Sequence, residues 1–139
     1  MWARQDTSRA GSHIGKTFGA QSNNSWQLQS SQSNPTNALS FTTQQSGHLY
    51  MYSPDGAIRV ATWQHLAATW DGAIKRLYVD GALATEMAQP APIDYDQSGM
   101  TIGCDDNTPL ASFYTGALDE VQLYDQALDV AQIQALARL

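Results

Sequence analysis

Alternation of apolar and polar residues along the chain predicts a domain built from β-strands. In "NSWQLQS", Trp26 and Leu28 alternate with glutamines, and in "NALSFTT", Leu39 and Phe41 alternate with polar residues. A period of two residues is typical of strands with one buried face. The segment "SSQSNPTN" between them has the composition of a loop. Strands are therefore a better interpretation of this polar region than a disordered tract, which would lack the regular aromatic positions.

Further strands are predicted in the segments "HLYMYS", "AIRVATW", "HLAATW", "IKRLYV", "ALATE", "MTIGC" and "GALDEVQLYD". Two Asp-Gly pairs, Asp71-Gly72 and Asp80-Gly81, separate three of them. Such pairs supply the positive backbone φ angles that tight hairpin turns need. Consecutive strands without helices between them predict an antiparallel sandwich or barrel.

A helix is predicted at the end of the chain. Asp129 and Gln132 have the spacing of a capping box, and Leu128 and Ile133 have that of a hydrophobic staple. Val130 and Ile133 begin an apolar stripe that is expected to be buried. The sequence thus predicts one all-β domain over residues 1–139, an antiparallel sandwich or barrel with a short C-terminal α-helix.

The low content of charged residues and the negative net charge limit the kinds of partner that the domain is expected to bind. Charged residues make up 14% of the chain and the net charge is −6, so a nucleic-acid partner is not expected, because phosphate binding needs clustered Lys and Arg. The stretch from Thr17 to Pro54 contains no Asp, Glu, Lys or Arg. No apolar run is long enough for membrane insertion, and "MWARQDTSRAGSH" lacks the apolar centre of a signal peptide.

Two segments resemble a known family. "WQHLAATWDGAIKRLYVDGALAT" and "FYTGALDEVQLYDQALDVAQIQAL" are similar to the central and closing motifs of laminin-G-like jelly-roll domains of the concanavalin A-like lectin and glucanase superfamily. The resemblance implies a jelly-roll sandwich, a carbohydrate-binding or adhesion function and an extracellular or cell-surface location. Family members usually have one or two strands before the one that "MWARQDTS" resembles. An open sheet edge would result, and it predicts a homo-oligomer or pairing with a partner strand.

The sequence does not predict catalysis. Glycosidases of this fold arrange acidic residues as Glu-x-Asp-x-(x)-Glu so that they share one face of a strand, because cleavage needs two carboxyl groups at a fixed separation. This pattern is missing, and the adjacent Asp119 and Glu120 would point to opposite faces. Cys104 is the single cysteine, which excludes an intrachain disulfide and the zinc patterns that need paired cysteines.

Asp119 leaves two alternatives open. By alternation it shares a face with Val121 and Leu123, and a carboxylate near a core needs a partner. The resemblance implies a Ca²⁺ ion at the rim of the sandwich, for which Asp119 with Asp105 or Asp106 would be the ligands. Alternatively, Asp119 accepts backbone N–H bonds and orders a turn.

In "HLYMYS" both alternating faces are apolar or aromatic, so either Leu49 and Met51 or Tyr50 and Tyr52 must face outward. Flat rings beside uncharged donors and acceptors suit a glycan. The residues expected to contact such a ligand are Trp26, Gln27, Gln29, Tyr50 and Tyr52. The same surface suits an uncharged interface between proteins. Two functions are therefore predicted, a non-catalytic glycan-binding or adhesion module and an assembly domain, with a glycoside hydrolase relic as a remote third.

Overall fold

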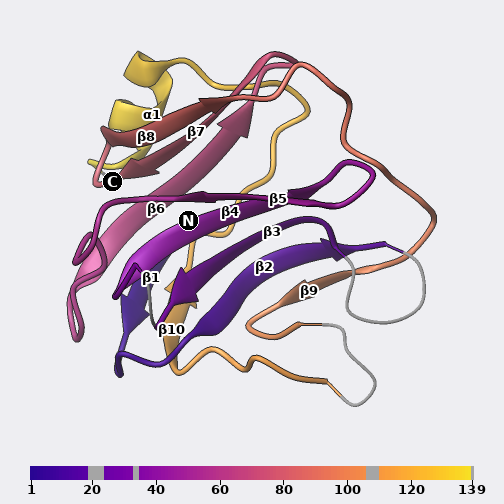
Figure 1. Ribbon diagram of the computed structural model, residues 1–139. Coiled ribbons are helices and arrows are strands. Elements are labelled where there is room, and N and C mark those ends of the chain that lie inside the picture. The colour runs from indigo at the N-terminus through magenta and orange to yellow at the C-terminus, as the bar shows by residue number, and fades with distance from the viewer. Residues whose placement is uncertain (19–23, 33–34, 106–109, 139) are drawn as a thin grey trace.

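The computed structural model describes residues 1–18, 24–32, 35–105 and 110–138 and is a β-sandwich (Figure 1). Within these ranges the strands form two antiparallel sheets. Sheet A has the order β10-β1-β6-β7-β8, and sheet B has the order β5-β4-β3-β2-β9. The predicted all-β sandwich with a short C-terminal helix is confirmed.

The bounds of the elements are as follows. Sheet A contains β1 (Trp2–Gln5), β6 (Trp63–Trp70), β7 (Ile74–Val79), β8 (Ala82–Ala88) and β10 (Gly116–Asp119). Sheet B contains β2 (Gly11–Thr17), β3 (Asn24–Ser31), β4 (Ala38–Gln44), β5 (His48–Tyr52) and β9 (Met100–Ile102). The helix α1 spans Val130–Leu136.

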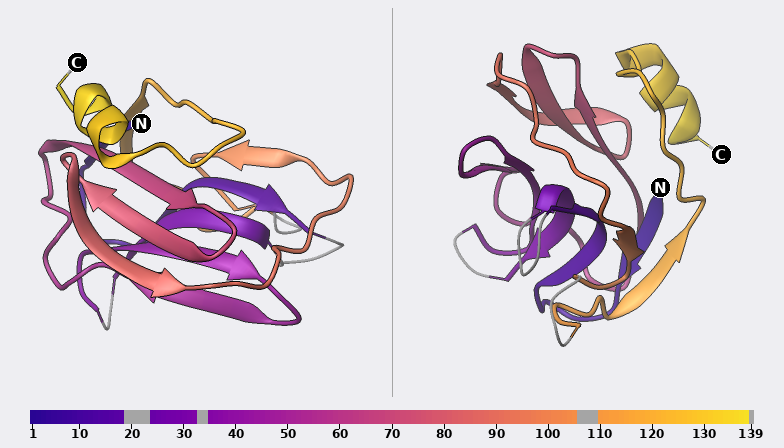
Figure 2. Two further views of the ribbon diagram at one scale, coloured as in Figure 1. Left: turned by 90° about the horizontal axis from the view of Figure 1, so that it is seen from above. Right: turned by 90° about the vertical axis from the view of Figure 1, so that its right-hand side faces the viewer.

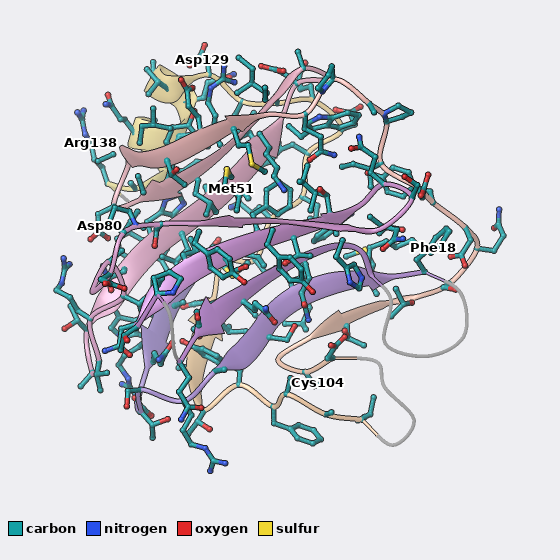
Figure 3. The ribbon with its side chains drawn as sticks, viewed as in Figure 1. Phe18, Met51, Asp80, Cys104, Asp129 and Arg138 are labelled. Atoms are coloured by element: carbon teal, nitrogen blue, oxygen red, sulfur yellow. The ribbon has the colours of Figure 1, made fainter. Side chains whose placement is uncertain are left out.

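The hydrophobic core lies between the two sheets. Leu28, Phe41 and Met51 contribute to it from sheet B, and Leu66 and Leu77 contribute from sheet A. All five are at most 6% exposed, and Figure 3 labels Met51 between the two layers. Burying a side chain of this kind stabilises the fold by about 2 kcal/mol. Neighbouring residues on a strand point to opposite faces. The polar residues that alternate with these core residues therefore face the outside of the sandwich.

The two predicted Asp-Gly turns are present. Asp80 and Gly81 both have positive φ, at 51° and 77°, which matches a tight hairpin turn between β7 and β8. In the turn between β6 and β7, Gly72 has a φ of 91°. Asp71 stabilises that turn because its Oδ1 accepts the backbone N–H of Ile74 at 2.8 Å.

The helix begins with the predicted capping box. Asp129 Oδ1 accepts the N–H of Gln132, and the N–H of Asp129 donates to Gln132 Oε1, both at 2.9 Å. Ile133 is buried, but Val130 is 50% exposed, so the expectation that Val130 joins the buried stripe is wrong. α1 lies against sheet A on the side away from sheet B (Figure 2). Among the described residues, no helix has the length and apolar character needed to cross a membrane.

One of the predicted strands is wrong, and one strand of the structure was not predicted. "AIRVATW" is a loop up to Thr62, in which Ile58 is 4% exposed and Val60 is 41% exposed, so their side chains do not share a buried face. The strand β2 was not predicted. It contains Gly11 and Gly15 and an irregularity of register between Ser12 and Ile14, and these features hide the alternation that identifies a strand.

Candidate functional site on the outer face of sheet B

Two rows of side chains cross the outer face of sheet B. Residues that lie directly opposite each other on antiparallel strands share a face. The register places Thr42 of β4 opposite Tyr50 of β5 and Gln27 of β3. Ser40 of β4 is opposite Tyr52 and Gln29 in the same way. These six residues are called the polar face below: Tyr50, Thr42, Gln27, Tyr52, Ser40 and Gln29.

The two tyrosines form the edge of the polar face. Tyr50 is 48% exposed and Tyr52 is 37% exposed, whereas Met51 between them is buried, so the tyrosines are the residues that face outward. Their rings are nearly parallel, with an interplanar angle of 7° and centroids 6.2 Å apart. Burial, followed by the neighbouring Tyr50, raises the pKa of Tyr52. Its hydroxyl therefore stays protonated near neutral pH and can donate a hydrogen bond.

The middle of the polar face is formed by smaller side chains. Ser40 and Thr42 are at most 4% exposed because they sit between the longer tyrosine and glutamine side chains of the neighbouring strands. Their hydroxyl oxygens are 3.4 Å apart. On the β2 side, Gln27 Nε2 donates to Ser12 Oγ at 3.1 Å, which fixes the position of the amide.

Some polar atoms beside the polar face lack a hydrogen-bond partner. Alternation along β3 and β4 places Ser25 on the same side as Gln27, and Gln44 on the same side as Thr42. Ser25 Oγ and Gln44 Oε1 are buried without a partner in the described part of the chain. A buried polar atom left unpaired costs about 1–3 kcal/mol, so water or a ligand hydroxyl would be stabilised here.

The polar face carries no formal charge. The described residues that alternate onto this side of β3, β4 and β5 include none of Asp, Glu, Lys and Arg. This agrees with the charge-free stretch of the sequence from Thr17 to Pro54. A ligand bound at this surface would therefore be held by hydrogen bonds and ring contacts rather than by ion pairs with these strands.

Of the five expected ligand contacts, the structure brings together Gln27, Gln29, Tyr50 and Tyr52. Trp26 does not lie with them. It is opposite Thr43 and Lys16 on the inner side of sheet B and packs against the core, because it alternates with Gln27.

Ser40 and Thr42 were not predicted from the sequence, although they lie at the centre of the polar face. Each is a small hydroxyl residue in an alternating strand, and nothing in the local sequence distinguishes it. The cross-strand register is the signal that identifies them.

Asp119 does not have the environment that was expected. It is exposed at the end of β10, and its Oδ1 accepts the backbone N–H of Glu120 at 2.8 Å. Glu120 has a φ of 47°, which ends the strand and breaks the alternation. Leu123 is consequently 57% exposed, although Val121 packs against the core. The expectation that Asp119 and Leu123 share a core face with Val121 is therefore wrong. The hydrogen bond to Glu120 matches the alternative role, in which Asp119 orders a turn.

The other expected calcium ligands come from the segment after β9. Asp105 forms an isolated bridge with Ala111, with backbone N–H to oxygen distances of 2.8 and 3.2 Å. Asp106 lies outside the described residues. The described residues contain no group of three or more His, Cys, Asp or Glu side chains placed to hold a metal ion. Calcium binding by Asp119 with Asp105 or Asp106 stays a prediction.

Comparisons with known proteins agree with the architecture. No curated protein sequence matches the chain. The sialidase carbohydrate-binding module CBM40 of Ruminococcus gnavus superposes with a TM-score of 0.79 and 15% identity, over 98% of this chain and 79% of that one. The heptameric SAP-like pentraxin of Limulus polyphemus gives a TM-score of 0.72 and 19% identity, over 98% of this chain and 66% of that one. At such identities the likeness establishes the fold alone.

The family itself is established from the sequence. The model of the concanavalin A-like lectin/glucanases superfamily matches residues 1–134, which is nearly the whole chain. The first of the two motifs singled out above lies within this match, and the second begins within it and extends two residues beyond it. The chain belongs to the concanavalin A-like lectin/glucanases superfamily.

Proposed function

We propose that the protein is a non-catalytic carbohydrate-binding module that holds a neutral glycan on the polar face. One observation carries the proposal. Two exposed and nearly parallel tyrosine rings, Tyr50 and Tyr52, border a surface whose other side chains are hydroxyls and amides.

The chemistry of a sugar matches both parts of this surface. The C–H groups of a pyranose ring form an apolar face that packs on an aromatic ring. Its hydroxyls both donate and accept hydrogen bonds, and so do the amides of Gln27 and Gln29 and the hydroxyls of Ser40 and Thr42. Ser40, Thr42 and Gln27 are at most 5% exposed, whereas Gln29 is partly exposed. The tyrosines would therefore hold the ring faces while Gln29 binds hydroxyl groups of the sugar directly.

The absence of charge on the described part of this surface favours a neutral ligand. The CBM40 module of Ruminococcus gnavus has been solved bound to α2,3 sialyllactose, a sugar that carries a carboxylate. Removing a carboxylate from water is costly unless a cation or several donors compensate for it. The polar face offers no Lys or Arg for this purpose, so a neutral oligosaccharide is the better match.

The absence of acidic residues from the described part of the polar face supports a binding role without catalysis. Hydrolysis of a glycosidic bond on this fold needs two carboxyl groups on opposite sides of the scissile bond. No Asp or Glu lies on the polar face among the described residues. A sugar bound beside Tyr50 and Tyr52 would have no acid or nucleophile within reach there.

An array of neutral and sialylated glycans, followed by calorimetry on the best ligand, tests the proposal. We expect saturable binding to a group of related neutral oligosaccharides. The variant Tyr50→Ala should weaken it by about tenfold, the scale of a lost ring contact together with its buried area. Tyr124→Ala is the matched control, because Tyr124 is 50% exposed but lies on the segment that leads to α1. Folded protein that binds no glycan, or binds equally well without Tyr50, would overturn the proposal.

A second function, assembly of copies of the chain, is favoured by a different observation. β5 is an edge strand of sheet B, and it carries neither Lys nor Pro, the residues that commonly protect such edges. Pairing of β5 with β5 of a second copy would cover Tyr50 and Tyr52. Light scattering across a range of concentrations tests this, and Tyr50→Lys should abolish any dimer. A monomer at all concentrations would leave glycan binding as the function of this surface.

A further inference from the structure

The aromatic edge of the polar face continues past the two tyrosines to His48. Alternate residues of a strand share a face, so His48, Tyr50 and Tyr52 all lie on the outer side of β5. The ring centroids of His48 and Tyr50 are 5.8 Å apart, and those of Tyr50 and Tyr52 are 6.2 Å apart. These three residues are called the ring strip below. At the rise of a β-strand, the strip is about 13 Å long between its first and last Cα atoms.

The members of the ring strip are all exposed, unlike the residues in the middle of the polar face. His48 is exposed, as the two tyrosines are. On the neighbouring strands, Ser40, Thr42 and Gln27 are at most 5% exposed. A ligand on this surface would therefore make most of its contacts along β5 rather than across the strands.

The imidazole of His48 offers a ligand a different contact from that of the tyrosine rings. Its plane is turned by 67° from the plane of Tyr50, so a molecule packed on the faces of the tyrosines would meet the edge of the imidazole. Nδ1 of His48 lies 3.4 Å from the hydroxyl oxygen of Tyr50, within hydrogen-bond distance. The other ring nitrogen, Nε2, remains to donate to a ligand hydroxyl or to accept from one.

The side chain of Gln44 adds a second polar group beside His48. The register of β4 and β5 places Gln44 directly opposite His48, in the same way that it places Thr42 opposite Tyr50. Gln44 is partly exposed, and its Oε1 is buried without a hydrogen-bond partner in the described part of the chain. Rotation of this long side chain would bring Oε1 to a donor on a ligand, and the hydrogen bond would remove the cost of leaving the oxygen unpaired.

We infer that the ligand of this surface is a linear, neutral oligosaccharide with at least three pyranose units. The inference rests on the proposed function and specifies the ligand of the same site. One unit would lie at each ring of the strip, because the distance between neighbouring rings is close to the length of one sugar unit in an extended chain. Two units would pack on Tyr50 and Tyr52. The hydroxyls of the third would form hydrogen bonds with His48 Nε2 and Gln44.

The shape of the ring strip favours a chain over a single terminal sugar. One sugar unit would cover one ring and leave the other two exposed to water, so it would gain only part of the available contact. Exposed residues lie beyond both ends of the strip, Gly47 before His48 and Pro54 after Tyr52. A longer chain can therefore continue in both directions, and the site is expected to bind internal segments of a glycan.

Oligosaccharides of increasing length test the inference on the intact protein. The probes are β-1,4-linked gluco-, manno- and xylo-oligosaccharides of one to six units, each titrated by calorimetry. In the series that binds, we expect the affinity to increase about tenfold from one unit to two, because a second ring contact forms. It should increase about tenfold again from two units to three, through the hydrogen bonds to His48 and Gln44. Further units should change the affinity by about twofold or less.

Three variants test where the third sugar unit binds. His48→Ala should weaken binding of the trisaccharide by about threefold and leave that of the disaccharide unchanged, because the shorter ligand occupies only the tyrosines. Gln44→Ala should have the same selective effect without removing the contact between His48 and Tyr50. Tyr50→Ala is the contrasting variant and should weaken binding of both sugars. Circular dichroism checks that each variant is folded.

The inference and the proposed function fail in different ways. A trisaccharide that binds no more tightly than the monosaccharide would overturn the inference and leave glycan binding intact. Equal effects on the disaccharide and the trisaccharide in both His48→Ala and Gln44→Ala would do the same. So would a glycan that binds on the array when none of the three series binds. Folded protein that binds neither the array nor the three series would overturn both.

Discussion

The ammonium group of Lys75 on β7 donates a hydrogen bond of 2.7 Å to the carbonyl oxygen of Leu49 on β5. It also donates to Phe41 O and to Thr43 Oγ1, each at 3.2 Å. Lys75 is fully buried, so this one side chain connects the two sheets through the core. All three acceptors are neutral. Burial is therefore not offset by a carboxylate, and it lowers the pKa of Lys75 to about 8.

The lowered pKa of Lys75 predicts a stability that increases in mildly alkaline solution. Between about pH 8 and the ordinary lysine pKa, the unfolded chain still holds a proton that the folded chain has released. The free energy of unfolding should therefore rise with pH in this window, by about 3 kcal/mol at most. Urea unfolding between about pH 7.5 and 9.5 measures the slope, and Lys75→Met should remove it. Equal slopes for both proteins would contradict the prediction.

His13 predicts a loss of stability in acid. Its side chain is fully buried, its ring packs against that of Tyr114 at 4.7 Å between centroids, and burial lowers its pKa to about 3. Below about pH 6.5 the unfolded chain binds a proton that folded His13 does not. The free energy of unfolding should then fall by about 1.4 kcal/mol per pH unit from this group. Urea unfolding between about pH 4 and 6.5 measures this slope, and His13→Asn should reduce it. Equal slopes for the two proteins would contradict the prediction.

The backbone conformation of Gly81 and its closeness to the end of α1 predict that a side chain added at this position destabilises the protein. Its φ is +77°, and an added Cβ would lie 3.1 Å from the Cβ of Ala137. Gly81→Ala should therefore destabilise the protein by about 2–3 kcal/mol, from backbone strain and from displacement of α1. Gly72→Ala is the control, because φ is +91° there but an added Cβ meets no atom within 4 Å. It should cost only about 1 kcal/mol, and equal losses in urea unfolding would contradict the contact with α1.

Replacing Gln29 should weaken glycan binding at the polar face less than replacing a tyrosine does. Its amide lies in the same row as Ser40 and Tyr52, so Gln29→Ala should remove one hydrogen bond to a bound sugar. We expect the dissociation constant to rise about fivefold, which corresponds to about 1 kcal/mol. Gln126→Ala, at an exposed position before α1, is the matched control and should bind normally. Calorimetry with the best neutral glycan measures both, and normal binding by Gln29→Ala would place the sugar elsewhere.

Calcium binding has a direct thermal test. If Asp119 acts with Asp105 or Asp106, calcium at about 10 mM should raise the melting temperature, because a ligand that binds the folded state stabilises it. EDTA should reverse the rise, and Asp119→Asn should abolish it. An unchanged melting temperature would leave Asp119 with the role that its hydrogen bond to Glu120 supports, which is to order the end of β10.

The sequence by itself determined the elements whose signals are local. Alternation in β3 and β4 indicated that Gln27 and Gln29 face away from Trp26 and Leu28, because successive side chains of a strand point to opposite faces. The expected ligand contacts nevertheless included Trp26, which lies on the inner side of sheet B. The Asp-Gly turns and the capping box at the start of α1 were also predicted correctly. Each depends on backbone geometry within a few residues.

Only the tertiary structure decided which residues stand next to each other. Thr42 lies between Tyr50 and Gln27 because of the register of three strands, and the end of β10 follows from a positive φ at Glu120 that no local pattern indicates. Pairings between distant segments depend on how the whole chain buries its apolar surface, and so the candidate sites emerged from the fold rather than from any single stretch of sequence.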